Sequence, residues 1–182
     1  MERLVKSVLS SADLPLAELC AARLDGEVYG VDCCFSPIDE VPSRLQRASA
    51  VASAAPRGVT AELATAAWVH GATFQPPNRH SFCVDLDKRV GNFLSAVFTV
   101  RERRLHRSEI VNIGELRLTS PLETAVDILR SEPFFDHERD TVDGLLKLGG
   151  VDAAACRDII ASRPSSPGNR RARNRLNSWA ET

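Results

Sequence analysis

Residues 118–127 read Leu-Thr-Ser-Pro-Leu-Glu-Thr-Ala-Val-Asp, and they carry the clearest local structural signal in the chain. Ser120 offers an N-cap hydroxyl, Pro121 stands at the first helical position and Glu123 at the third, so every part of a capping box is present. The apolar residues that follow recur at helical spacing as far as Arg130. We therefore expect a helix that begins directly after Ser120.

Extended runs precede this helix. The sequence predicts strands over 81–86 and 93–101, then a hairpin over 110–119 that turns at Gly114. Helices are predicted on both sides of these strands, over 42–54, 60–71, 141–148, 152–160 and 169–179. Helices that bracket a small sheet place the chain in the α+β class.

The N-terminal region has the order helix, turn, hairpin. Apolar residues within 2–10 recur at helical spacing, and a second helix is expected to begin near Asp13 and Pro15. Residues 27–35 then predict a short hairpin that turns near Gly30. This order matches the second half of a winged helix-turn-helix.

We expect three parts in the chain. Residues 1–38 would form a truncated, degenerate winged-helix-like module. Residues 39–163 would form an α+β domain, on which the module packs, with a helix-flanked sheet that is mixed or antiparallel. Residues 164–182 would supply a linker, rich in proline and serine, and a basic terminal helix.

The net charge of the chain is close to zero. Its 182 residues include 23 basic and 24 acidic side chains, for a formal charge of −1 and a pI of about 6.4. This balance excludes a uniformly basic nucleic-acid-binding domain. Along the chain the charge is uneven: residues 1–54 hold five basic against eight acidic side chains, whereas 164–182 hold four against one. Any DNA contact must therefore come from a local patch.

Cysteine usage and hydropathy indicate a cytoplasmic protein. The five cysteines form no CxxC pair, which argues against a zinc ribbon or a disulfide framework and favours buried, reduced, structural thiols. The adjacent Cys33 and Cys34 are expected to point to opposite faces of a strand. No apolar run approaches the roughly 18–20 residues that span a bilayer. We predict no metal, no cofactor and no membrane partner.

The sequence offers little for catalysis. It contains no HExxH, glycine-rich phosphate loop or GxSxG motif. We interpret His70 as a hydrogen-bonded, partly buried histidine rather than a base. Asp85 and Asp87 would share one face of a strand and could hold magnesium for a metal-dependent phosphodiesterase or nucleotidyltransferase. Since no third carboxylate is placed beside them, we favour a strand end and a non-enzymatic protein.

Two arginine clusters are candidate binding surfaces. They predict contact with a phosphate backbone or with an acidic protein partner. The alternative is a solvated face that pairs with the acidic stretch 132–143. The clusters comprise Arg101, Arg103, Arg104 and Arg107 in the middle of the chain, and Arg170, Arg171, Arg173 and Arg175 near its end.

The order of these pieces resembles the AbiEi-type antitoxin family of type IV toxin–antitoxin systems, in its actinobacterial form. The resemblance covers about residues 14–180 and is most specific in 66–71, Ala-Ala-Trp-Val-His-Gly, and in 118–127. The chain also resembles the front portion of proteins that carry a C-terminal Vsr-like endonuclease, but it stops before such a domain, so we expect no nuclease activity. The family-motif positions are Trp68, His70, Thr119, Ser120, Pro121, Thr124 and Asp127.

The resemblance implies an N-terminal winged helix that binds operator DNA and a C-terminal domain that neutralises a nucleotidyltransferase-like toxin encoded nearby. The acidic balance of 1–54 and a hairpin without lysine or arginine over 27–35 argue against DNA contact by the N-terminal module. We therefore expect an antitoxin-like regulatory protein that acts through a protein partner. The alternative is a DNA-binding transcriptional regulator that uses both arginine clusters.

Thr124 and Asp127 lie three residues apart in the predicted helix, and both could meet backbone groups or the arginine strand. We hypothesise that Asp127 faces Arg101 or Arg103.

Overall fold

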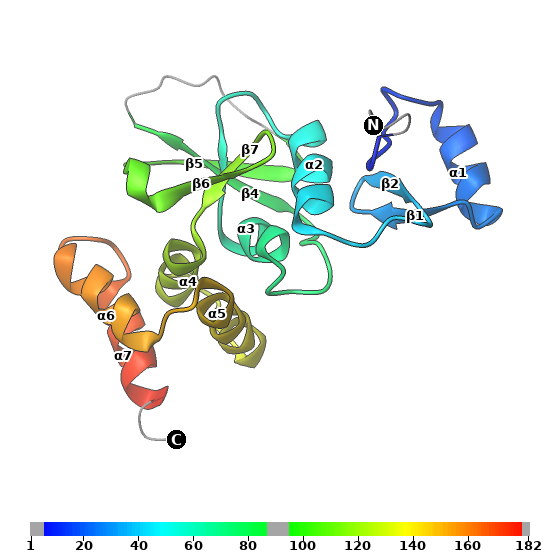
Figure 1. Cartoon of the computed structure of the whole chain (residues 1–182). Coiled ribbons are helices and arrows are strands. Elements are labelled where there is room, and N and C mark those ends of the chain that lie inside the picture. Colours follow the sequence, from blue (N-terminus) through cyan, green and yellow to red (C-terminus); the bar gives the residue numbers. More distant parts are fainter. Residues whose placement is uncertain (1–5, 87–94, 180–182) are drawn as a thin grey trace. The chain divides into compact units, whose positions relative to one another are not determined.

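The computed structural model describes residues 6–86 and 95–179. The chain divides into two compact units (Figure 1). Unit 1 comprises residues 1–57 with 112–116, and unit 2 comprises 58–111 with 117–182. The division therefore falls after residue 57, where we expected a boundary after 38, and the terminal helix belongs to unit 2.

Unit 1 contains the expected helix and hairpin. Helix α1 (Leu16–Leu24) is followed by the antiparallel strands β1 (Val28–Val31) and β2 (Cys34–Pro37). The core between them is small and consists of Leu19, Val28 and Phe35, with Leu9 packed against it. Helix α2 (Arg44–Ala54) begins at a complete capping box between Ser43 and Gln46.

Four local expectations for unit 1 are wrong. Of the helical segment expected over 2–10, residues 2–5 lie outside the described residues and 6–10 form no helix; instead Leu9 makes a β-bridge with Phe35. The hairpin turns at Asp32 and Cys33 rather than at Gly30, because Gly30 pairs with Phe35 inside the ladder. Cys33 therefore lies in the turn, and its Sγ lies 3.9 Å from that of Cys34 instead of on the opposite face. Cys33 and Cys20 are exposed rather than buried as expected.

A mixed five-stranded sheet confirms the α+β class. Its order is β5-β4-β3-β7-β6, with β4 antiparallel to β3, and with β5 parallel to β4 and β7 parallel to β3. The strands are β3 (Thr60–Ala61), β4 (His80–Asp85), β5 (Phe98–Arg103), β6 (Ile110–Ile113) and β7 (Leu116–Thr119). A 3₁₀ turn, η1 (Arg107–Glu109), precedes β6. The β6–β7 hairpin turns around Gly114, as the sequence predicts.

Thr60 does not open a helix. It pairs with Cys83 across the antiparallel ladder, so Thr60 and Ala61 form the short central strand β3. Helix α3 (Leu63–His70) begins only after Glu62, which occupies the N-cap position. The helical periodicity from residue 60 onward therefore spans both a strand and a helix.

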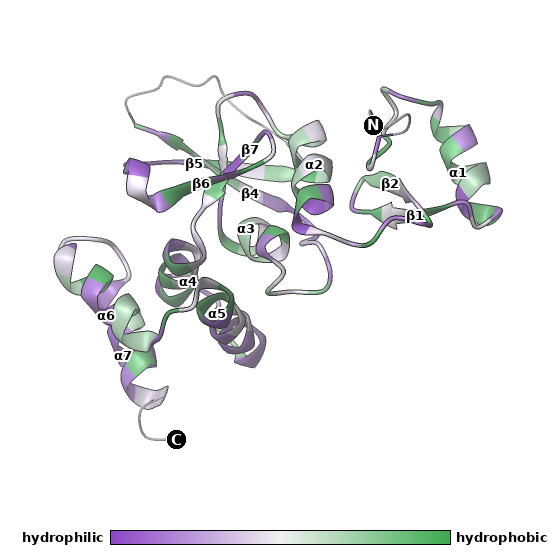
Figure 2. Cartoon of the chain, in the orientation of Figure 1, coloured by the Kyte–Doolittle hydropathy of each residue, from purple (hydrophilic) through white to green (hydrophobic). Residues whose placement is uncertain are grey.

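Helix α4 (Pro121–Arg130) is the centre of the helical layer. Every residue from Glu123 to Leu129 is buried. Helices α5 (Asp136–Gly149), α6 (Ala153–Ser162) and α7 (Asn169–Trp179) complete the layer, and α4 packs against each of them as well as against α3. In Figure 2, α5 and α7 carry both hydrophilic and hydrophobic residues, as amphipathic helices packed by one face do. No helix in the described part of the chain is long and apolar enough to cross a membrane.

Gly168 sets how closely α7 approaches the end of α4. Its φ is +82°, and a Cβ at this position would lie 2.6 Å from the carbonyl oxygen of Arg130. Its own carbonyl oxygen accepts the N–H of Ala172 and so starts α7. A side chain at residue 168 would push α7 away from α4.

We predict that Gly168→Ala destabilises the protein more than Gly58→Ala. Both glycines have φ near +80°, so each substitution adds left-handed backbone strain of roughly 1–2 kcal/mol. Only at Gly168 does the new Cβ also meet a backbone oxygen, which should cost at least about 1 kcal/mol more. Urea denaturation of both variants measures the difference, and equal destabilisation would show that α7 can shift freely.

Candidate functional site

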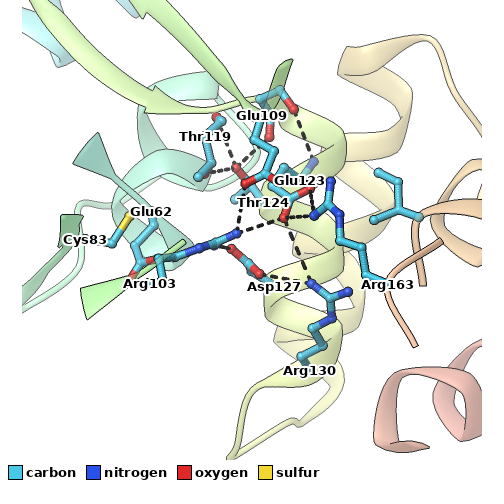
Figure 3. A network of polar contacts seen from close by, with 12 residues as sticks. Glu62, Cys83, Arg103, Glu109, Thr119, Glu123, Thr124, Asp127, Arg130 and Arg163 are labelled. Atoms are coloured by element: carbon cyan, nitrogen blue, oxygen red, sulfur yellow. Dashed lines mark hydrogen bonds and ion pairs between the residues drawn. The ribbon is translucent and has the colours of Figure 1, made fainter. Parts of the chain in front are cut away.

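Arg103, at the end of β5, is surrounded by four buried carboxylates (Figure 3). Its Nη2 lies 3.2 Å from Glu109 and 3.0 Å from Glu123. Its Nη1 pairs with Asp127 and lies 3.6 Å from Glu62. The carboxylates come from the N-cap of α3, from η1 and from α4, so one guanidinium joins three other elements to the sheet.

Three further arginines complete this arginine–carboxylate cluster. Arg101 donates two hydrogen bonds to the Glu62 carboxylate, from Nε to Oε1 at 2.5 Å and from Nη2 to Oε2 at 2.7 Å. Arg163 bonds both oxygens of Glu123 at 2.8 and 3.0 Å and lies 3.1 Å from Glu109. Arg130 lies 3.6 Å from Asp127 and donates to Asn169 at 2.9 Å.

The cluster balances four guanidinium groups against four carboxylates. Each carboxylate side chain is less than a tenth exposed, so an unpaired one would carry a large desolvation penalty. The arginines that contact them are therefore structural ion-pair partners. This accounts for Arg101 and Arg103, two of the residues we singled out as candidate binding groups.

The position of Asp127 confirms the hypothesis that this residue faces Arg101 or Arg103. Asp127 contacts Arg103 directly, and its Oδ2 lies 3.8 Å from Arg101. Burial raises the pKa of Asp127 to about 6, opposed by the attraction of Arg103 and reinforced by the neighbouring Glu123. Below that pH the cluster therefore gains net positive charge.

The capping box at Ser120 is only half formed. The Ser120 hydroxyl accepts the backbone N–H of Glu123 at 3.2 Å, and Pro121 occupies the first turn, as the sequence predicts. The Glu123 side chain, however, pairs with Arg103 and Arg163, and the Ser120 N–H donates to the Glu109 carbonyl. The ion pairs have replaced the second capping bond.

Sequence reasoning missed Glu62, Glu109 and Arg163 altogether. Each is a single charge whose role depends on a partner elsewhere in the chain: Arg163 is 40 residues from Glu123. For Glu62 the sequence did offer a signal of burial, because it is the single charged residue in the mostly apolar run 59–64, Val-Thr-Ala-Glu-Leu-Ala. A charge in such a run is buried only if another charge meets it.

The other family-motif residues form a junction between α3, β7 and α4. The ring N–H of buried His70 donates to the Thr119 carbonyl at 2.7 Å, which confirms that His70 is a hydrogen-bonded core histidine. The Thr124 hydroxyl lies 2.7 Å from that of Thr119 and 2.8 Å from the Ser120 carbonyl. Trp68 is buried in α3. The motif thus maintains the packing of unit 2.

Two arginines of the terminal cluster bind α7 to the C-terminal end of α4. Arg175 donates to the carbonyls of Leu129 and Ser131, each at 2.7 Å, and stacks over the Phe134 ring. Arg171 donates to the Arg130 carbonyl and lies 3.2 Å from Glu132. The two cations thus bind carbonyls at the C-terminus of α4, where the helix dipole favours positive charge.

The remaining four candidate arginines have no such internal role. Within residues 6–86 and 95–179, their side chains are exposed and have neither an ion-pair nor a hydrogen-bond partner. These residues are Arg104, Arg107, Arg170 and Arg173.

A cavity of about 740 Å³ brings the two arginine clusters together within unit 2. The end of β5, the end of α4 and the loop that joins α6 to α7 form its walls. Both Arg104 from the middle cluster and Arg171 from the terminal cluster border it. The arginines that line it are Arg101, Arg103, Arg104, Arg130, Arg163 and Arg171.

The proposed magnesium pair receives no support from the described residues. Asp85 is the last residue of β4, and Asp87 lies outside the described residues. Among residues that the structure describes, no group of three or more histidine, cysteine, aspartate or glutamate side chains is placed to hold a metal ion.

We predict strong energetic coupling between Arg103 and Asp127. A double-mutant cycle with Arg103→Gln and Asp127→Asn should give a coupling free energy of about 2 kcal/mol, because the pair is largely desolvated. The exposed pair Arg171 and Glu132 is the matched control, with an expected coupling below about 1 kcal/mol. Urea denaturation measures both cycles. No coupling at Arg103 would mean that the pair contributes nothing to stability.

No family model and no curated protein matches the chain. Among solved structures, the chain is similar to the Rv2827c protein from Mycobacterium tuberculosis, with 17% sequence identity and a TM-score of 0.39. That similarity covers 94% of this chain and 76% of the other.

Proposed function

We propose that this chain is a non-enzymatic regulatory protein of the AbiEi antitoxin type that contacts DNA through unit 2. The observation that supports it is the division among the eight candidate arginines. Four are held by internal partners, and the other four, Arg104, Arg107, Arg170 and Arg173, are exposed to solvent without one in the described structure. Exposed arginines without internal partners are available to neutralise phosphates.

The outer face of α7 has the composition of a nucleic-acid contact. Arg170, Arg173, Asn174 and Asn177 are spaced three and four residues apart, so they share one face, and all are exposed. The buried Ala172 and Leu176 lie toward the opposite side of the helix. Arginine contacts phosphates and guanine, and asparagine contacts adenine. No acidic residue occurs between 169 and 179 to oppose them.

Unit 1 is a poor alternative for the same contact. Residues 1–54 hold five basic against eight acidic side chains, and the β1–β2 hairpin has no lysine or arginine. An acidic module would be repelled by a phosphate backbone. The proposal therefore assigns DNA contact to unit 2, whereas the AbiEi resemblance implies the N-terminal module.

The test is the salt dependence of binding to duplex DNA from upstream of the protein's own gene, measured by fluorescence anisotropy. Removing one arginine that binds a phosphate should reduce the slope of log K against log salt by about one. Arg170→Gln combined with Arg173→Gln should therefore reduce it by about two. Arg44→Gln combined with Arg57→Gln removes the same charge from exposed positions in unit 1 and should leave the slope unchanged.

A second candidate function is binding of a protein partner, such as a nucleotidyltransferase-like toxin encoded nearby. Unit 1 favours it, since Leu16, Leu24, Ile38 and Val41 are all at least 60% exposed. Absence of salt-dependent DNA binding would contradict the first proposal. Capture of the neighbour-encoded protein, abolished by Leu16→Ser with Leu24→Ser, would then support the second.

A further inference from the structure

We propose that the arginine-lined cavity of unit 2 binds a phosphate-bearing small molecule of nucleotide size. This site goes beyond the proposed DNA contact, because its walls are built from residues that the outer face of α7 does not supply. Its volume of about 740 Å³ lies within the range of small-molecule sites, roughly 300–1,000 Å³.

The charge of the lining favours an anion. Six arginines line the cavity, and they are opposed there by the carboxylates of Glu102, Glu109 and Asp127. Glu62 and Glu123 stand behind the lining in ion pairs. Glu132 pairs with Arg171 in the same way, so with these three partners counted the carboxylates equal the arginines in number. The cation that remains available to a ligand is Arg104, which has no partner in the described residues.

A second, independent observation in favour of an anion concerns Arg130. Its side chain is only 10% exposed, and its Nη2 is fully shielded from solvent and has no hydrogen-bond partner among the described residues. A buried donor on a cation that lacks an acceptor is costly and rare in folded proteins. Because Arg130 lines the cavity but its Nη2 is shielded from it, a phosphate oxygen would supply that acceptor only after the guanidinium turns toward the cavity.

The neighbouring groups suit phosphate better than a simple halide. Guanidinium groups bind phosphate with two parallel N–H donors, which adds geometric specificity to charge. The loop residues Ser165 and Ser166 also border the cavity, between Pro164 and Pro167. The two prolines restrict the backbone that presents these hydroxyls, so ligand binding costs less conformational entropy.

Isothermal titration calorimetry of the full chain at low salt, with inorganic phosphate, pyrophosphate, ATP and adenosine, tests the site. We expect pyrophosphate and ATP to bind and adenosine to fail. Equal affinity for pyrophosphate and ATP would support a site that recognises phosphate alone, and tighter binding of ATP would support one that also contacts the nucleoside. No heat from phosphate, pyrophosphate or ATP at concentrations of about 1 mM, equivalent to about 4 kcal/mol of binding, would overturn the proposal.

Variants locate the binding. Arg104→Gln should weaken ATP or pyrophosphate about tenfold by removing one charge-assisted contact, and it leaves every internal ion pair intact. Arg107→Gln is the matched control, since Arg107 is also exposed but does not line the cavity. Arg130→Gln should weaken binding at least as much. If Arg130→Gln fails to fold, the comparison of Arg104→Gln with Arg107→Gln still tests whether the ligand binds in the cavity.

Equal binding by wild type, Arg104→Gln and Arg107→Gln would place the ligand elsewhere and overturn the assignment. Arg170→Gln with Arg173→Gln separates this proposal from the DNA contact. That double variant should bind ATP normally even if its affinity for DNA falls.

Discussion

The burial of four carboxylates around Arg103 is the constraint on which unit 2 depends. Glu62, Glu109, Glu123 and Asp127 come from three separate elements, yet each needs a cation once it leaves water. Arg103 can meet all four only if β5, η1 and the start of α3 lie against α4. Arg103 also lines the cavity, so the ion pairs that hold unit 2 together also form part of the candidate site.

Internal partners also determine which arginines of this nearly neutral chain remain available to a ligand. The carboxylates of the cluster are neutralised by internal arginines, and Arg171 and Arg175 are held at the end of α4. The arginines outside these contacts keep their charge available to solvent, on the loop after β5 and on the outer face of α7. Net charge therefore says little about binding here; what matters is which charges already have internal partners.

Local signals were predictable from the sequence, and long-range pairings mostly were not. The spacing of Ser120, Pro121 and Glu123 predicted the start of α4, and the helical position of Asp127 led to its arginine partner. The convergence of Glu62 and Arg163 on the same cluster depends on strand order and on the α6–α7 connection, which no local pattern encodes. Thr60 was misassigned because a two-residue strand is too short to show a periodicity of its own.

The dependence of unit 2 on the Arg103 guanidinium can be tested by comparing Arg103→Lys with Arg104→Lys. Arg103 is the last residue of β5 and Arg104 is the next in the chain, yet the two substitutions should differ completely. Lysine keeps the charge but cannot reproduce the guanidinium fork that only Arg103 uses internally. We expect Arg103→Lys to lower the free energy of unfolding by at least about 2 kcal/mol and Arg104→Lys to stay within about 0.5 kcal/mol of wild type. Equal effects at the two positions would show that the buried carboxylates do not depend on the Arg103 guanidinium.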